Sequence, residues 1–223
     1  MPVEIQDMPA TPSPGFVFDQ VSWEDYEAML RIVGDRPIRV TYDRGRMRVI
    51  SPLWTRGSPA FLLGAMVSIL VEEWNLSYEP ADPVTFRRRD LEKGAEPDKC
   101  FHLGANTARI RGKREIQLPD DPPPDLVVEV DVTASSVERL PIFGALGIAE
   151  VWRFSNGVLE FLHLQPEATY RAEAHSLAFP RLAVADAERF LKEGLDADKT
   201  AWGRAFRAYV RDNLVDPPPG AQP

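Results

Sequence analysis

The chain has 223 residues, a formal net charge of −8 and 44% hydrophobic residues. This length and composition predict one globular domain with extensions, and the negative charge argues against coating nucleic acid through bulk charge. The single cysteine, Cys100, excludes an internal disulfide framework and a cysteine-based zinc site, and it fits a reducing, cytoplasmic location. We expect neither a signal peptide nor a membrane span, because no apolar run approaches about 18 residues.

The N-terminal part of the chain combines a proline-rich arm with two short elements. Four prolines lie within residues 1–15, which predicts a flexible arm. Ser22 is a favourable helix cap with Asp25 three residues later, so we expect a helix from there to about Val33. Residues 38–50 read as two strands around a short glycine-containing turn and predict a β-hairpin.

The strongest helix signal lies in residues 58–74, where apolar side chains recur at helical spacing. We expect Ser58 to cap this helix and Pro59 to occupy its first turn. Residues 84–88 predict a further strand, which turns back through residues 90–94.

Two acidic residues stand two positions apart at the start of the next predicted strand. Glu96 and Asp98 flank a proline and lead into the apolar positions Cys100 and Phe101. A residue before proline also serves simply to turn the chain, so Glu96 is open to a purely structural interpretation.

A basic segment follows at residues 108–114. A solvated loop is one interpretation of it, and contact with DNA phosphates is the other. The candidate nucleic-acid-binding residues are Arg109, Arg111, Lys113 and Arg114.

Residues 125–132 form the segment around which the chain is organised. Three prolines precede it, and its β-branched composition predicts a buried central strand. Alternate side chains share a face of a strand, so Glu129 and Asp131 point away from Val128 and Val130. Burying two unpaired carboxylates is costly, so we expect a divalent metal or a cationic partner to offset their charge.

Together the two acidic pairs predict an oxygen-rich site between neighbouring strands, suited to Mg²⁺ or Mn²⁺. The candidate metal ligands are Glu96, Asp98, Glu129 and Asp131. The alternative is that some of them lie in solvent at strand ends or pair with arginine. The histidines show no ligand spacing, and the sequence contains neither a glycine-rich phosphate loop nor a nucleophile elbow.

The C-terminal half predicts a helix, a hairpin and two further helices. Ser135 or Ser136 is expected to cap a helix that Gly147 ends. Residues 149–162 predict a β-hairpin that turns at an Asn-Gly pair. The last two helices are expected at residues 184–193 and 197–212.

Three segments resemble the Uma-two family of restriction endonucleases, within the PD-(D/E)XK nuclease superfamily. They are Glu96-Pro97-Asp98, the strand from Pro124 to Val130, and residues 147–152. The resemblance runs from about Trp23 to Arg211, and the three motifs occur in the order and spacing of the family.

The resemblance implies an α/β fold with a restriction-endonuclease-like mixed β-sheet core flanked by helices. An N-terminal β-hairpin and a C-terminal helical extension would complete it. On this basis we expect four parts: a flexible arm at 1–15, an endonuclease-like domain at 16–180, C-terminal helices at 181–214 and a flexible tail at 215–223. The implied activity is metal-dependent hydrolysis of DNA phosphodiester bonds.

Carried over by position, Asp98 is the motif aspartate and Glu129 the acidic residue that follows it, and both would hold the metal. The superfamily lysine falls at Asp131, so Arg139 is the candidate catalytic cation, with Lys99 next. As an arginine at a helix start, Arg139 is expected to contribute little to the core.

Three functions remain open at this point. The first is a metal-dependent DNA endonuclease, and the second is a catalytically lapsed nuclease-fold protein that binds DNA. The third is a homodimeric interaction module, suggested by the acidic charge and the apolar hairpin around Trp152, Phe154 and Phe161. DNA and a second copy of the chain are therefore the expected partners, with no membrane association.

Overall fold

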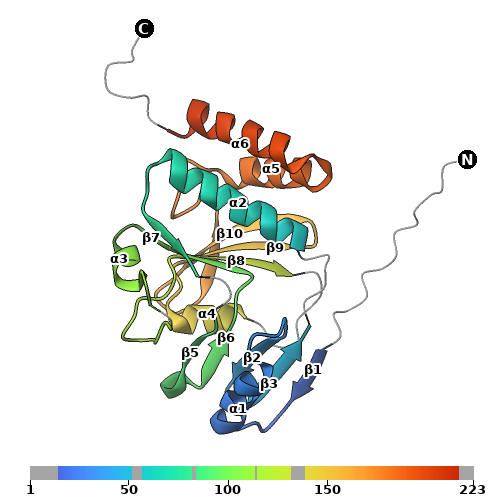
Figure 1. The fold of residues 1–223 in the computed structure, drawn as a ribbon, viewed down its shortest axis with the longest axis vertical. Coiled ribbons are helices and arrows are strands. Elements are labelled where there is room, and N and C mark those ends of the chain that lie inside the picture. Colours follow the sequence, from blue (N-terminus) through green and yellow to red (C-terminus); the bar gives the residue numbers. More distant parts are fainter. Residues whose placement is uncertain (1–14, 52–56, 82–83, 114, 132–138, 216–223) are drawn as a thin grey trace, which may run out of the picture.

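The chain forms two β-sheets flanked by helices, as shown by a computed structural model (Figure 1). The structure describes residues 15–51, 57–81, 84–113, 115–131 and 139–215. The predicted mixed α/β fold is confirmed, with strands at its N-terminal end and helices at its C-terminal end. Arg114, the cap residues Ser135 and Ser136, and most of the predicted arm and tail lie outside the described residues.

The five-stranded sheet is antiparallel throughout its described strands, in the order β1-β3-β2-β6-β5. The predicted hairpin is confirmed as β2 and β3, and α1 (Trp23–Val33) begins at the predicted capping box of Ser22 and Asp25. The ring of Tyr26, on this helix, stacks on the ring of Tyr42, on β2, with their centroids 4.8 Å apart. The strands are β1 (Gly15–Phe18), β2 (Arg39–Asp43), β3 (Arg46–Ile50), β5 (Phe86–Arg88) and β6 (Lys93–Ala95).

The six-stranded sheet has the order β11-β10-β9-β8-β7-β4. Its described neighbours pair antiparallel except β8 and β9, which run parallel and are joined through α4 (Leu140–Leu146). The predicted central strand is confirmed as β8, and all but its last residue are buried. The strands are β4 (Tyr78–Pro80), β7 (Lys99–Leu103), β8 (Leu126–Asp131), β9 (Glu150–Ser155), β10 (Val158–Leu164) and β11 (Tyr170–Glu173).

Helices cover both faces of this second sheet (Figure 1). One face of the sheet packs against α2 (Gly57–Glu73), and α4 covers the opposite face. Helices α5 (Val184–Asp196) and α6 (Lys199–Asn213) pack against α2 on the first face. The predicted helices are found, but two of their starts differ from the prediction. Helix α2 begins one residue before the expected cap Ser58, and α4 begins only at Leu140 with Arg139 as its N-cap, so the expected cap at Ser135 or Ser136 is wrong. Gly147 ends α4 as predicted, in a left-handed conformation with φ of 83°.

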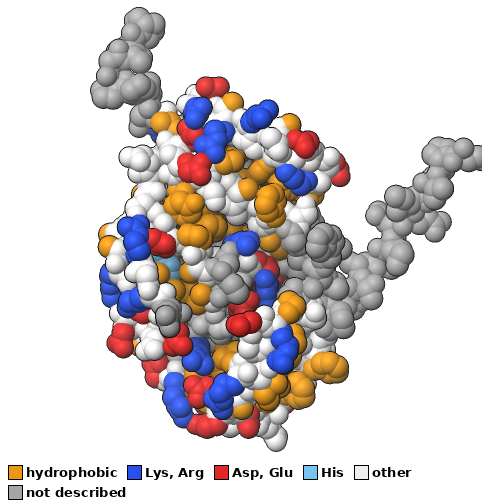
Figure 2. Space-filling model, in the orientation of Figure 1, with side chains coloured by type: hydrophobic (Ala, Val, Ile, Leu, Met, Phe, Trp, Pro, Cys, Tyr) orange, Lys and Arg blue, Asp and Glu red, His pale blue; other side chains and the backbone are white. Residues whose placement is uncertain are grey.

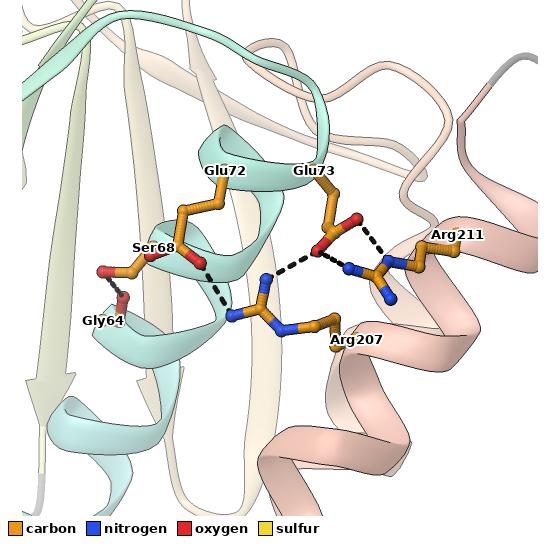
Figure 3. Close-up of polar contacts among 6 residues, drawn as sticks. All are labelled: Gly64, Ser68, Glu72, Glu73, Arg207 and Arg211. Atoms are coloured by element: carbon orange, nitrogen blue, oxygen red, sulfur yellow. Dashed lines mark hydrogen bonds and ion pairs between the residues drawn. The ribbon is translucent and has the colours of Figure 1, made fainter. Parts of the chain in front are cut away.

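Ion pairs hold α6 against the C-terminal end of α2 (Figure 3). Arg207 donates to Glu73 at 2.5 Å and to Glu72 at 2.7 Å, and Arg211 donates to the two oxygens of Glu73 at 2.6 and 3.0 Å. These contacts lower the pKa of Glu73, and the bond from Arg211 contributes most. The charged contacts therefore fix α6 over the helix that covers the central sheet.

Several short elements have no prediction from the sequence. They are too short to give a periodic signal in the sequence. These elements are β1, β4, β6, β11, α3 (Thr107–Ile110) and the 3₁₀ turns at Arg89–Leu91 and Gly104–Asn106, and the first two residues of β6 lie where a turn was expected.

The predicted hairpin is confirmed as β9 and β10, but its aromatic residues face the core of the same chain. Trp152 and Phe161 are fully buried and their rings stack 4.8 Å apart, and Phe154 packs against the same core. The expectation that they offer surplus apolar surface is wrong, because helices α2 and α5 cover that face. Homodimerisation therefore stays a prediction without this support.

In the described part of the chain, every helix is too short or too polar to cross a membrane.

Candidate active site

The two faces of β8 differ as the strand alternation predicts. Leu126, Val128 and Val130 belong to the core under α2, whereas Val127 packs with the core of α4. Glu129 therefore shares the α4 face with Val127, and the next residue on that face is Asp131. The sequence-predicted pair of carboxylates thus lies on one face of the central strand.

Asp98 joins this face from the neighbouring strand. It immediately precedes β7, which pairs antiparallel with β8 and aligns Lys99 with Val128. The Asp98 amide donates to the Val128 carbonyl at 3.1 Å, and the Val130 amide donates to Asp98 Oδ2 at 2.7 Å. Asp98 is therefore fixed at 8% exposure beside Glu129, the arrangement predicted from the two acidic motifs.

Glu129 is the most deeply buried carboxylate of this group, at 1% exposure. Its Oε1 lies in ion-pair contact with Arg139, and neither Oε1 nor Oε2 accepts a hydrogen bond among the described residues. Burial raises the pKa of Glu129 well above its ordinary value, Arg139 opposes this shift, and Asp98 and Asp131 add to it. A positive charge next to Oε2 would therefore be strongly favourable.

Arg139 enters the site from the residue before α4. Its guanidinium contacts Glu129 and lies 3.2 Å from Asp131 Oδ1, and the residue is 7% exposed. The prediction that it reaches the acidic strand is consistent with this placement. The expectation that it contributes little to the core is wrong, because the side chain is enclosed with two carboxylates.

Arg39 is a second cation of the site, and sequence reasoning missed it. It begins β2 in the other sheet, pairs with Asp98 Oδ1, and lies 3.5 Å from Glu96 Oε1. The chain segment that connects β6 to β7 brings Glu96 and Asp98 past the start of β2. No local signal marks Arg39, because it is 59 residues away from Asp98 in the chain.

Lys99 lies on the opposite face of the sheet. Phe101 and Leu103 lie two and four positions after Lys99 along β7, so they share its face of the strand, and both pack under α2. A Cβ added at Gly64 of α2 would lie 3.6 Å from Cγ and Cδ of Lys99. The prediction of Lys99 as the next candidate cation is therefore wrong, because its stem runs along α2 rather than toward Glu129.

Comparison with known proteins shows the family to which the chain belongs. The family model Uma2, described as "Putative restriction endonuclease", matches residues 23–198. The chain belongs to the Uma2 family. The matched range contains both sheets apart from β1, together with Arg39, Asp98, Glu129 and Arg139.

A solved structure is also similar to this Uma2 chain. It is described as "Crystal structure of a putative nuclease belonging to DUF820 from Anabaena variabilis ATCC 29413". The two sequences are 15% identical, the match covers 74% of this chain and 98% of that chain, and the TM-score is 0.49. No curated protein matches the sequence.

The residues of this Uma2 chain fit one divalent cation held by two carboxylates. Mg²⁺ usually keeps several waters and takes one or two protein carboxylates, so Asp98 and Glu129 would suffice. No cluster of three or more histidine, cysteine or acidic groups suited to a metal occurs among the described residues. Glu96 and Asp131 therefore stand at the edge of the candidate site, each contacted by an arginine.

Three basic side chains of the segment expected to bind DNA form hydrogen bonds or ion pairs with other residues of the same chain. Arg109 donates to the Asp120 carbonyl at 2.8 Å, Arg111 donates to Glu79 at 2.5 Å, and Lys113 pairs with Asp121. Figure 2 shows acidic and basic side chains interspersed over this face of the molecule. The role of these residues in DNA binding stays a prediction, and binding would require them to exchange partners.

A groove of about 990 Å³ extends from Lys113 of the basic segment to the edge of the acidic site, and Asp98 and Glu129 are not among the residues that line it. Arg39 and Glu96 line it together with Lys113, the C-terminal end of α1 and residues 84–89. Its described lining contains five basic and five acidic side chains. Attraction of a polyanion into the groove would therefore depend on added positive charge at the acidic site.

Proposed function

We propose that this Uma2 protein is a divalent-metal-dependent endonuclease that hydrolyses DNA phosphodiester bonds. The single observation that carries the proposal is the buried, unpartnered Glu129 Oε2 on the same sheet face as Asp98. Family membership supports a restriction-endonuclease-like nuclease, and the carboxylate pair supports Mg²⁺ or Mn²⁺ as its cofactor.

A divalent cation bound by Asp98 and Glu129 would polarise a phosphoryl oxygen and lower the pKa of water. The chain itself would supply fixed positive charge through Arg139, which stays protonated at any working pH. Arg139 would hold the Glu129 carboxylate in place and balance negative charge, but it cannot transfer a proton. Glu96 or Asp131, both more exposed than Glu129, would accept the proton of the attacking water.

A second candidate function is a lapsed nuclease that binds DNA without cutting it. The observation that favours it is that arginine already contacts both metal carboxylates, Arg39 at Asp98 and Arg139 at Glu129. Asp131 also stands where the resemblance leads us to expect a lysine. In that case the same cleft would bind DNA with no requirement for metal.

A plasmid-nicking time course tests the proposal. We expect wild type to convert supercoiled plasmid to open circles with Mn²⁺ or Mg²⁺ and not with a chelator. Glu129→Gln should lose at least about 10²-fold in rate, the usual effect of removing one preorganised charge. The matched control is Glu193→Gln, an exposed change on α5, which should nick as wild type does.

Nicking by Glu129→Gln at the wild-type rate would rule out the assigned site. DNA binding by wild type without nicking under any divalent metal would favour the lapsed nuclease instead.

A further inference from the structure

Arg139 and Arg39 would compete unequally with a cation for the carboxylate oxygens of the site. Arg139 forms its ion-pair contact with Oε1 of Glu129, and Oε2 accepts no hydrogen bond from the described residues. On Asp98 both oxygens are engaged, Oδ2 by the Val130 amide at 2.7 Å and Oδ1 by Arg39. A cation between the carboxylates therefore meets an oxygen on Glu129 that accepts no hydrogen bond, but it competes with the positive charge of Arg39 for Asp98 Oδ1.

Arg39 is placed so that it can give up this contact without losing its position. Its Nε lies 3.5 Å from Glu96 Oε1, so a second carboxylate holds the guanidinium when Asp98 is released. Arg39 and Glu96 both line the groove, whereas the side chain of Arg139 is only 6% exposed. Of these two arginines, Arg39 is the one that can turn toward a bound ligand.

We propose that Arg39 is a substrate-binding residue that changes partners between Asp98 and a phosphate of the substrate. In the metal-free chain it neutralises Asp98, and once a divalent cation occupies Asp98 Oδ1 its guanidinium binds a DNA phosphate in the groove. The planar guanidinium suits both partners, since it binds carboxylate and phosphate in the same forked geometry. This inference rests on the proposed function, because it requires the cation site.

Calorimetric titration of the full chain with Mn²⁺ tests the first half of the exchange. We expect Arg39→Gln to bind Mn²⁺ about ten- to a hundredfold more tightly than wild type, because a charge-assisted hydrogen bond no longer competes for Asp98. Arg39→Lys should fall between them, and it serves as the readout if the glutamine variant does not fold. Arg44→Gln, an exposed change beside the other end of β2, is the matched control and should leave affinity unchanged.

Fluorescence anisotropy with a labelled DNA duplex tests the second half. With Ca²⁺ as a divalent probe, Arg39→Gln should bind the duplex more weakly than wild type, whereas in a chelator the two should bind alike. If wild type binds Mn²⁺ and Arg39→Gln binds it no more tightly, the proposed exchange of partners by Arg39 is wrong, while the cation site itself stands. If neither wild type nor Arg39→Gln binds Mn²⁺, the proposed cation site fails and the inference falls with it.

Discussion

Replacing Arg139 by methionine tests whether this buried arginine compensates Glu129. Methionine keeps much of the apolar stem, so the main loss is the positive charge beside a carboxylate of 1% exposure. The carboxylate then takes up a proton, since an isolated buried charge is far more costly. Protonating a glutamate of ordinary pKa about 4.3 at pH 7 costs at most about 3.7 kcal/mol, at about 1.4 kcal/mol per pH unit.

The expected loss of stability is below that limit, because burial already raises the pKa of Glu129 in the wild type. We expect a loss at pH 7 that stays below this limit and below the usual cost of breaking a buried ion pair. For a chain of this length each kcal/mol lowers the Tm by about 2–4 °C. The variant should therefore melt clearly below wild type at neutral pH.

The stability lost in Arg139→Met is expected to depend on pH. With a raised pKa the folded chain holds a proton on Glu129 that the unfolded chain has lost, so stability falls as pH rises from the ordinary glutamate pKa toward the folded pKa. Arg139→Met extends the pH range over which stability falls to higher pH, because the positive charge of Arg139 lowers the pKa of Glu129. Its deficit should therefore be smaller at pH 5 than at pH 7.

Urea denaturation followed by tryptophan fluorescence at pH 5, 6 and 7 measures these values. The double variant Arg139→Met with Glu129→Gln removes both charges and should recover much of the loss at pH 7. An equal deficit at pH 5 and pH 7, or no recovery in the double variant, would refute the reasoning.

Two further predictions concern the helices that enclose the sheet. Arg211→Gln should lower stability slightly at neutral pH, because Arg211 lowers the pKa of Glu73. The deficit should shrink as pH falls below the ordinary glutamate pKa and disappear below the lowered pKa of the folded chain, and a deficit that persists unchanged in melts at acid pH would contradict this. Gly144→Ala should destabilise by about 1–3 kcal/mol in urea denaturation, because its Cβ would lie 2.1 Å from the Ala168 carbonyl oxygen. Wild-type stability in that variant would show that α4 shifts freely.

Part of the site could be predicted because it depends on local periodicity. The alternation of β8 placed Glu129 on the face opposite Val128, and pairing with β7 brought Asp98 beside it. The same alternation excludes Lys99, since adjacent residues of a strand point to opposite faces. That signal was available in the sequence, and the prediction of Lys99 did not apply it.

The cations of the site could not be placed in this way. Arg39 belongs to a different sheet and meets Asp98 only because the chain crosses from β6 to β7 beside the start of β2. Arg139 looks like an exposed residue at a helix start, and only the packing of α4 on the sheet buries it. Contacts between sheets are set by tertiary packing, which periodicity does not encode.

Calorimetric titration of Mn²⁺ into wild type and Asp98→Asn tests the central claim most directly. The proposed site predicts one bound cation in wild type and at least about a tenfold weaker affinity in the variant, since a carboxylate ligand becomes a neutral amide. Thermal melts of both proteins provide the check that the variant is folded. Equal Mn²⁺ binding by the two folded proteins would contradict the assignment of Asp98 and, with it, the proposed site.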